Sequence, residues 1–327
     1  MLRTRTNCKP ERLRPGRGDK TTRAQPHVTV PSTSQSWSQL GIGFRSSVGA
    51  RIVLPANVVG HGTQAASAHL GDRGNEPGEG VNLSGKVALV TGASRGIGRG
   101  IAEAFGTAGA SVAVNYRTGA SAAEEVVASI RSSGQDAIAI QADVAEEDDV
   151  DRMVATVLDQ FGRIDVLVSS AGILTQSHLA DMPTRMWDEM MRTNLRSAFL
   201  CTRALLPGML SRQSGSIIYI ASQLGLKGAP DLVHYSAAKA ALIGMTRALA
   251  REVAPHVTVN TIAPGPIETD MLANITEDWK AMKLAELPLA RFGRVSDVAP
   301  TAVFLASDDA AYYTGQVLGP NGGDVMP

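Results

Sequence analysis

The sequence predicts a single α/β domain with a doubly wound, mainly parallel sheet of seven strands and helices on both faces. Short apolar segments alternate with amphipathic segments of helix length from about residue 83 to the C-terminus, and a glycine-rich turn joins the first pair. The 327 residues are 44% hydrophobic, enough for one large core. Strands that alternate with helices form right-handed βαβ units, which make neighbouring strands parallel.

The elements follow one another at regular intervals. We expect strands at 86–91, 111–116, 136–144, 163–172, 215–222, 257–265 and 315–323. We expect helices at 96–109, 121–134, 146–162, 186–211 and 234–254. The strand segments are short, nearly continuous apolar runs, typical of strands that are buried on both faces. Acidic residues open the helix at 146–162, where the helix dipole favours them.

Residues 1–80 differ from the expected domain at 81–327. They hold 11 Lys and Arg against 5 Asp and Glu, a net charge of +6 that leaves −6 for the remainder. We weigh three explanations: a transit peptide, which would be rich in Arg and Ser and poor in acids; a disordered nucleic-acid-binding arm, against which the scattered charges argue; and an upstream extension of the reading frame. We favour the last, because Arg outnumbers Lys 24 to 7, as in GC-rich coding sequences.

The overall composition argues against several classes of protein. The formal net charge is zero, so nothing global points to a nucleic-acid or membrane partner. The two cysteines, Cys8 and Cys201, make a disulfide framework or a cysteine metal site improbable. No run of about 18 apolar residues predicts a transmembrane helix. We therefore expect a cytoplasmic protein, or one of an organelle matrix if residues 1–80 are a transit peptide.

The turn between the first strand and helix has glycines at Gly92, Gly96 and Gly98. Without Cβ atoms, the backbone can turn tightly and approach a pyrophosphate, while the helix N-terminus offers unpaired N–H groups. The spacing G-x3-G-x-G differs from the common G-x-G-x-x-G of dinucleotide sites. The turn predicts a dinucleotide cradle; the alternative is a tight connection without a ligand.

The end of the second strand bears on the choice of cofactor. A site for NAD usually places an acidic residue there, to bind the ribose 2′-hydroxyl. This chain has Asn115, Tyr116 and Arg117, with no acidic residue before Glu124, and Arg95 lies within the glycine turn. Two guanidinium groups suit a 2′-phosphate, so we expect NADP(H) rather than NAD(H). The alternative is that Arg117 is a solvated surface charge.

Several motifs, in order, resemble the short-chain dehydrogenase/reductase family in its shorter form. They include "TGASRGIG" at 91–98, "ADV" at 142–144, "YSAAK" at 235–239 and "PGPIET" at 264–269. The family's Asn-Asn-Ala-Gly motif appears here as "SSAG" at 169–172, a departure that we expect to weaken support of the sheet but to leave the chemistry intact. The resemblance covers about three quarters of the chain and implies a single Rossmann-like domain.

The resemblance implies four catalytic residues: Asn194, Ser222, Tyr235 and Lys239. In the family, the tyrosine is the general acid/base and the serine binds the substrate oxygen. The lysine also holds the nicotinamide ribose, and the asparagine holds a water that links the lysine to solvent. Each could instead have an ordinary structural role, but Tyr235 follows Ser222 at the family's usual interval of thirteen residues, with Lys239 four residues later.

The spacing of Tyr235 and Lys239 supports this role independently. Residues i and i+4 lie on one face of a helix. An ammonium about 4 Å from the phenol would contribute roughly 4 kcal/mol at an effective dielectric constant near 20, lowering its pKa by about three units before desolvation. His234 precedes Tyr235 and should point off that face, so we expect it at the pocket rim. No metal is expected, since His178 and His256 lack ligand spacing.

The expected cofactor contacts combine the glycine turn, the second-strand residues and the positions implied by the resemblance. They are Gly92, Ser94, Arg95, Gly96, Ile97, Gly98, Asn115, Tyr116, Arg117, Asp143, Val144, Ser170, Ala171, Gly172, Tyr235, Lys239, Pro264, Gly265, Ile267 and Thr269. Within the resemblance, Asp143 flanks the adenine and Thr269 contacts the nicotinamide carboxamide.

Within the family, the chain is most similar to the 3-oxoacyl-[acyl-carrier-protein] reductases, which implies reduction of an acyl-thioester ketone in fatty acid biosynthesis. The alternatives are a reductase of a free ketone, a sugar or a steroid-like alcohol, and a non-enzymatic, cofactor-sensing scaffold. The charge of −6 after residue 80 disfavours an acidic carrier, as do Asp181 and His256 where we expect arginines. We expect 272–289 to form a substrate lid.

The resemblance also implies a homo-oligomer. Family members usually form homotetramers, and otherwise homodimers, through two long helices and the last strand. In this chain the helices correspond to 186–211 and to 235–254.

Overall fold

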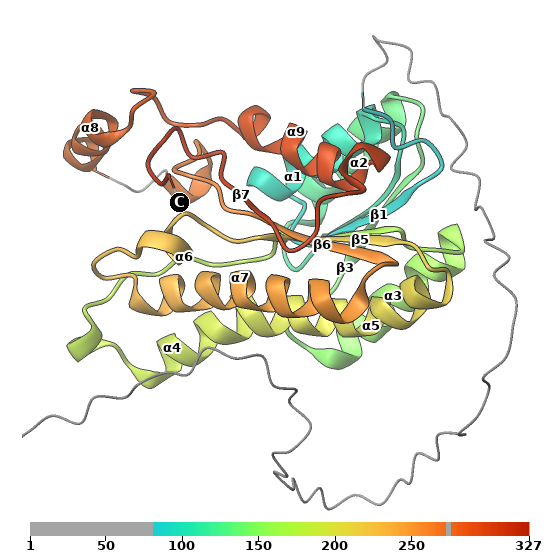
Figure 1. Ribbon diagram of the computed structural model, residues 1–327, viewed down its shortest axis with the longest axis horizontal. Helices are drawn as coiled ribbons and strands as arrows, with labels where there is room; N and C mark the ends of the chain where they lie inside the picture. The colour runs from blue at the N-terminus through green and yellow to red at the C-terminus, as the bar shows by residue number, and fades with distance from the viewer. Residues whose placement is uncertain (1–80, 273–275, 327) are drawn as a thin grey trace, which may run out of the picture. The chain divides into compact units, whose positions relative to one another are not determined.

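The structure is a computed structural model that describes residues 81–272 and 276–326 (Figure 1). Residues 1–80 lie outside the described residues, so the three explanations for them stay predictions. The same holds for the domain boundary expected at residue 81, which adjoins that segment. Part of the expected lid at 272–289 also falls outside them.

The described residues form one seven-stranded sheet in which every strand pair is parallel. The strands are β1 (Val87–Val90), β2 (Ser111–Tyr116), β3 (Ala137–Gln141), β4 (Val166–Ser169), β5 (Gly215–Ile220), β6 (Val257–Ile262) and β7 (Val317–Leu318). The strand order across the sheet is β3-β2-β1-β4-β5-β6-β7. From β1, the chain first adds strands on one side (β2, β3) and then, starting with β4, on the other side. The predicted doubly wound fold is confirmed, and ligands of such folds bind at this switch point.

Helices cover both faces of the sheet (Figure 1). They are α1 (Gly96–Thr107), α2 (Ala120–Ser132), α3 (Glu147–Phe161), α4 (Thr184–Met191), α5 (Ser197–Ser211), α6 (Leu224–Lys227), α7 (Val233–Val253), α8 (Glu277–Glu286) and α9 (Val295–Ala306). Short 3-10 turns lie at η1 (Leu179–Asp181), η3 (Asp270–Leu272) and η4 (Asp308–Ala310).

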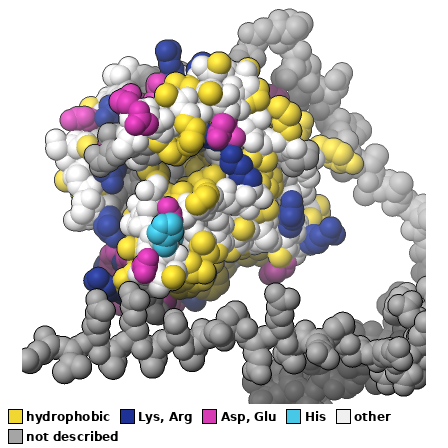
Figure 2. Space-filling model, turned by 90° about the vertical axis from the view of Figure 1, so that its left-hand side faces the viewer, with side chains coloured by type: hydrophobic (Ala, Val, Ile, Leu, Met, Phe, Trp, Pro, Cys, Tyr) yellow, Lys and Arg dark blue, Asp and Glu magenta, His cyan; other side chains and the backbone are white. Residues whose placement is uncertain are grey.

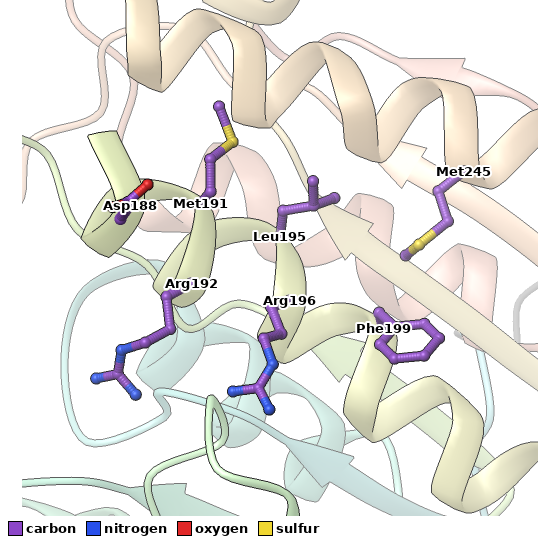
Figure 3. Close-up of a pocket in the computed structure, with 7 residues that line it drawn as sticks. All are labelled: Asp188, Met191, Arg192, Leu195, Arg196, Phe199 and Met245. Carbon is purple, nitrogen blue, oxygen red and sulfur yellow. The ribbon is translucent and has the colours of Figure 1, made fainter. Parts of the chain in front are cut away.

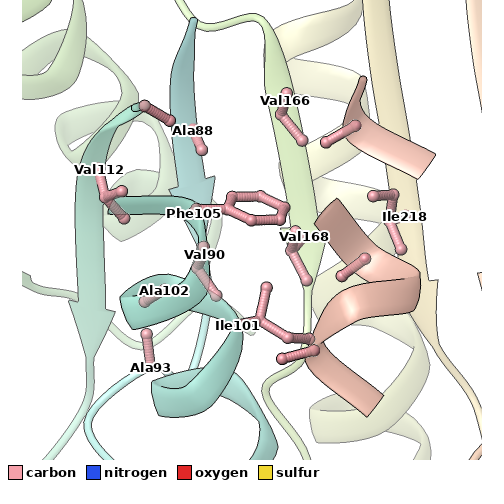
Figure 4. Packing of buried hydrophobic residues seen from close by; sticks show 14 of the residues in the cluster. Ala88, Val90, Ala93, Ile101, Ala102, Phe105, Val112, Val166, Val168 and Ile218 are labelled. Carbon is pink, nitrogen blue, oxygen red and sulfur yellow. The ribbon is translucent and has the colours of Figure 1, made fainter. Parts of the chain in front are cut away.

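The sheet separates two apolar cores, because successive side chains of a strand point to opposite faces. Val166 and Val168 of β4 pack with α1, α2 and α9 on one face (Figure 4). Leu167, between them, packs with α3, α5 and α7 on the other. Both faces are therefore buried, which explains why the strand segments read as continuous apolar runs.

The helix expected at 186–211 is divided. A π-helical segment, η2 (Arg192–Arg196), joins α4 to α5. The wider turn carries Asn194, whose side chain is engaged by the backbone of Ile173 in the loop after β4. Helix α9 was not expected from the sequence, although it packs extensively on α1 through Gly100, whose missing Cβ would lie 1.9 Å from Val295 Cγ1.

Within the described residues, no helix combines the length and the apolar character needed to cross a membrane. The expected cytoplasmic location stays a prediction.

Candidate active site

The glycine turn after β1 lies against the loop after β4. Gly92 has φ of +62°, and a Cβ on it would lie 2.8 Å from Cα of Ala171. A Cβ on Gly98 would lie 2.5 Å from the Gly92 carbonyl oxygen. Side chains at these two positions would therefore push the turn apart, and their absence leaves backbone exposed at the start of α1. Such a cradle, at a helix N-terminus, fits a pyrophosphate.

Two buried polar side chains hold this turn. Thr91 Oγ1 accepts hydrogen bonds from the backbone N–H groups of Ser170 and Ala171, at 3.0 and 3.1 Å. Asn115 Oδ1 accepts one from Gly92 N at 3.1 Å, and its amide donates to Ala142 O at 3.2 Å. We expected Asn115 among the cofactor contacts, but its side chain is 1% exposed and is committed to the turn. Thr91 was not singled out, although it belongs to the quoted motif.

The two arginines expected near the adenosine end differ in their partners. Arg95 is exposed at the N-terminus of α1, and within the described part of the chain its guanidinium group has no hydrogen-bond or ionic partner. Arg117 lies 3.8 Å from Asp143, and Arg192 binds the same carboxylate oxygen at 3.2 Å. Of these two arginines, Arg95 is thus the one without a partner among the described residues, and it is available to bind an anion.

Other expected contacts reach the same edge of the sheet. Thr269, after β6, lies beside Gly96, because a Cβ on Gly96 would be 3.6 Å from Thr269 Cγ2. Gly265 N donates to Pro320 O at 3.1 Å, which ties the Pro264 turn to the C-terminal segment. Val144 is 6% exposed and packs in a core, so only its backbone is available to a ligand.

Tyr235 and Lys239 project from α7 towards the end of β5, where Ser222 follows. A hydrogen bond joins the side chains of Ser222 and Tyr235. Burial raises the pKa of the Tyr235 phenol above its usual value near 10, and the hydrogen bond to Ser222 offsets part of that rise. The phenol is therefore protonated at neutral pH and is ready to act as an acid.

Lys239 is buried as well, and it lies close to Asn194. Its ammonium donates to Ile220 O at 2.8 Å and lies 5.6 Å from the centroid of the Tyr235 ring. Burial lowers the pKa of Lys239 to about 8.

Gly172 separates the lysine from Asn194. A Cβ on Gly172 would lie 3.1 Å from Asn194 Oδ1 and 3.6 Å from Lys239 Nζ. The Asn194 amide pairs with both backbone groups of Ile173, accepting at 2.7 Å and donating at 2.9 Å. These bonds hold the loop after β4 beside the lysine, and the expected water relay stays a prediction.

His234 is not at the pocket rim, and that expectation was wrong. The ring is fully buried, and its Nε2 lies 2.8 Å from Thr175 Oγ1. Burial lowers the pKa of His234, which keeps the ring neutral. It therefore ties the first turn of α7 to the loop after β4, one residue before Tyr235.

Comparisons with known proteins agree with this geometry. The sequence model of a family described as enoyl-(acyl carrier protein) reductase matches residues 92–324. The 3-oxoacyl-[acyl-carrier-protein] reductase FabG of Staphylococcus aureus is 47% identical over 242 residues, which are 74% of this chain and 98% of that protein. A reductase of the same description from Synechocystis is 48% identical over 246 residues, 75% of this chain and 98% of the relative.

A short-chain type dehydrogenase/reductase from Mycobacterium marinum has a similar solved structure. Its TM-score is 0.72 at 35% identity, over 76% of this chain and 98% of that one. The chain belongs to the short-chain dehydrogenase/reductase family. It is therefore an oxidoreductase whose family uses a nicotinamide cofactor. The glycine cradle fits such a group, as does Arg95, which has no partner in the part of the chain that the structure describes.

Sequence reasoning missed a polar group beside the active site of this short-chain dehydrogenase/reductase. Gln223 follows Ser222 and binds the carboxylate of Asp324, close to the C-terminus, as do Lys227 and Lys283. No local pattern in the sequence connects residues so far apart.

We predict that Lys239→Met abolishes turnover but stabilises the fold. A lysine whose pKa falls from 10.5 to about 8 on folding binds fewer protons in the folded state, so its ionisation opposes folding by about 3 kcal/mol below pH 8, and this cost disappears as pH rises towards 10.5. Urea unfolding at pH 7 should show a gain of about 1–3 kcal/mol that shrinks at pH 9.5.

The matched control is Lys280→Met, which removes a more exposed helical lysine paired with Glu277. It should change stability little at either pH. A Lys239→Met variant that is less stable than the wild type at pH 7 would contradict the assignment of an ionised, poorly compensated lysine.

Proposed function

We propose that this protein is an NADPH-dependent ketone reductase that acts on 3-oxoacyl thioesters. The observation that carries the proposal is the convergence of Ser222, Tyr235, Lys239 and Asn194 beside a glycine cradle at the carboxyl edge of one parallel sheet. The four side chains come from three separate elements, and chance alone would rarely bring them together.

The chemistry follows from the state of each side chain. A reduced nicotinamide nucleotide supplies a hydride when it is bound. Ser222 donates a hydrogen bond to the ketone oxygen and orients it, and Tyr235 gives that oxygen a proton, so that the product is a secondary alcohol. The Lys239 ammonium stabilises the phenolate that remains. A phenol with a raised pKa carries its proton at neutral pH and can therefore serve as the proton donor for reduction.

We infer that the substrate enters at an apolar end of the molecule. Figure 2 views the end of the molecule where α6, α8 and the C-terminal segment lie, and apolar side chains gather there around a hollow. The exposed apolar side chains on α6, η3, α8, the turn after α8 and the C-terminal segment are Leu226, Met271, Met282, Leu289 and Met326. An acyl chain suits such a surface, and the relatives at 47–48% identity are named as 3-oxoacyl-[acyl-carrier-protein] reductases. The acidic balance of residues 81–327 instead favours a free ketone or a thioester without an acidic carrier.

We predict that Tyr235→Phe lowers kcat by about 10²–10⁴, because it removes the proton donor while preserving the ring. The assay is NADPH oxidation with acetoacetyl-CoA and a panel of small ketones. Tyr312→Phe is the matched control, since that side chain is fully exposed and should leave the rate unchanged. Reduction at a normal rate by Tyr235→Phe would contradict the mechanism, and activity confined to the small ketones would favour the alternative substrate class.

We propose Arg95 as the residue that selects NADPH over NADH. Its guanidinium group is exposed at the start of α1 without an ionic partner in the described residues, whereas the neighbouring Arg99 is bound by Glu103 and Glu125. Guanidinium groups bind phosphate through paired, charge-assisted hydrogen bonds.

We predict that Arg95→Gln raises the KM for NADPH by about tenfold and leaves the KM for NADH unchanged, as expected for the loss of one charged contact. Steady-state kinetics with both nucleotides measure the ratio. Arg99→Gln is the control, since its charge is already compensated. A wild-type enzyme that uses NADH as efficiently as NADPH would refute the choice of cofactor itself.

We propose that the protein forms a homo-oligomer through α4, η2 and α5. An apolar groove of about 560 Å³ lies there, lined by Asp188, Met191, Arg192, Leu195, Arg196, Phe199 and Met245 (Figure 3). Phe199 is 46% exposed, a large fraction for an aromatic ring. The face carries both acidic and basic side chains, so a two-fold axis can pair it with itself.

We predict that Phe199→Asp reduces the molar mass in solution, because it places two carboxylates at the centre of a symmetric apolar contact. Light scattering coupled to size-exclusion chromatography measures the change from the homotetramer or homodimer. Leu158→Asp, at an exposed apolar position on α3, is the control. A wild-type monomer, or a Phe199→Asp variant with unchanged mass, would exclude this interface.

A further inference from the structure

The carboxylate of Asp324 binds three side chains that are distant from it in the sequence. Its Oδ1 lies 2.7 Å from Lys227 Nζ on α6, and its Oδ2 lies 2.7 Å from Lys283 Nζ on α8. The side-chain amide of Gln223 also donates to Oδ2. The carboxylate is only 6% exposed, so these bonds are largely shielded from water.

The charges in this cluster support one another. Burial raises the pKa of Asp324, but the ammonium groups of Lys227 and Lys283 lower it by more. The pKa of Asp324 therefore lies below its usual value. The pKa of Lys283 is raised by the two carboxylates that face it, those of Asp324 and Glu286, against the effect of burial. Asp324 and Lys283 therefore keep their opposite charges at neutral pH, and removing the central carboxylate leaves the ammonium groups of Lys283 and Lys227 without their shared partner.

The cluster is attached directly to the catalytic serine. Gln223 follows Ser222, and its N–H donates to Pro264 O at 3.0 Å. The next N–H, that of Leu224, donates to Ser222 Oγ at 3.1 Å. Gly225 brings this turn against α7, because a Cβ there would lie 2.8 Å from the backbone of Lys239. A displacement of the turn from 222 to 227 would therefore move the serine hydroxyl.

The opposite side of the cluster is α8. Lys283 is the buried residue of this helix, whereas Met282 beside it is 54% exposed. Helix α8 and α6 lie at the same end of the molecule, with the C-terminus between them (Figure 1). Asp324 thus links α8 to the turn that follows Ser222.

We propose that Asp324 is a positioning residue that holds α8 and the Ser222 turn in place across the substrate entrance before substrate binds. A catalytic group held in place by neighbouring bonds loses less entropy when the substrate arrives, and small misplacements cost much of the rate. The kinetic part of this inference rests on the proposed reductase function, and its structural part does not.

Two substitutions distinguish the contact of Asp324 with α8 from its contacts with the Ser222 turn. Asp324→Asn removes the charge that joins them, and we expect KM for acetoacetyl-CoA to rise and kcat to fall, each by about tenfold. Lys283→Met keeps the apolar stem and releases only α8, so we expect KM to rise by a similar factor with kcat within about twofold of wild type. Lys280→Met, on the same helix but paired with Glu277, is the matched control and should retain both constants.

Hydrogen exchange measured by mass spectrometry provides a readout independent of activity. In Asp324→Asn and Lys283→Met, the amides of residues 276–286 should exchange faster than in the wild type and in Lys280→Met. A role confined to overall stability would instead lower the unfolding temperature, with KM, kcat and this local exchange unchanged in the folded protein.

The outcomes separate the two proposals. A wild type that reduces no ketone, with faster α8 exchange in both variants, would remove the reductase function and keep the cluster's role in holding α8. Normal kinetics and normal exchange in folded Asp324→Asn would overturn the positioning role. Should that variant fail to fold, Lys283→Met decides: unchanged KM and unchanged exchange overturn the proposal, and the expected pair of changes supports it.

Discussion

All strands of this sheet run in the same direction, and the site depends on that constraint. Parallel strands bring their carboxyl ends to one edge, so the turns after β1, β4, β5 and β6 must share a small volume. The approach is so close that side chains are excluded where the turns meet: Gly92 faces Ala171, and Gly225 faces the backbone of Lys239. The exposed backbone that could cradle a phosphate and the small distances between catalytic groups are both consequences of this crowding.

The same crowding sets the protonation states. Lys239 and Tyr235 are buried because α7 packs directly on β6 and on α6, and burial disfavours the charged form of each. The two shifts have opposite signs on the pH scale: the phenol keeps its proton more firmly, and the ammonium loses its proton more readily. A site that must donate a proton from the phenol and still retain a cation beside it therefore works best below about pH 8, where the lysine is charged.

Local patterns in the sequence were sufficient for the strands, the glycine turn and the Tyr235–Lys239 pair, because each depends on spacing within one element and its neighbour. They failed where a residue's surroundings come from elsewhere. The π-helical turn at Asn194 has no distinct periodicity, and the burial of His234 depends on Thr175, 59 residues earlier. The Asp324 cluster reaches back 101 residues to Gln223, and no local pattern singled out any of its members. Long-range polar contacts of this kind need the fold before they can be recognised.

The distribution of charge also indicates which arginine could bind the 2′-phosphate of NADPH. The sequence offered two arginines, but Arg117 faces Asp143, and Arg192, which binds the same carboxylate, is itself held by Glu146 and Glu189. That network holds two arginines and three carboxylates, so in our proposal the positive potential for a 2′-phosphate rests on Arg95. A single exposed guanidinium group is screened within about 8 Å at physiological ionic strength. The proposed preference for NADPH should accordingly be moderate and should weaken as salt increases, unlike a preference built from several buried cations.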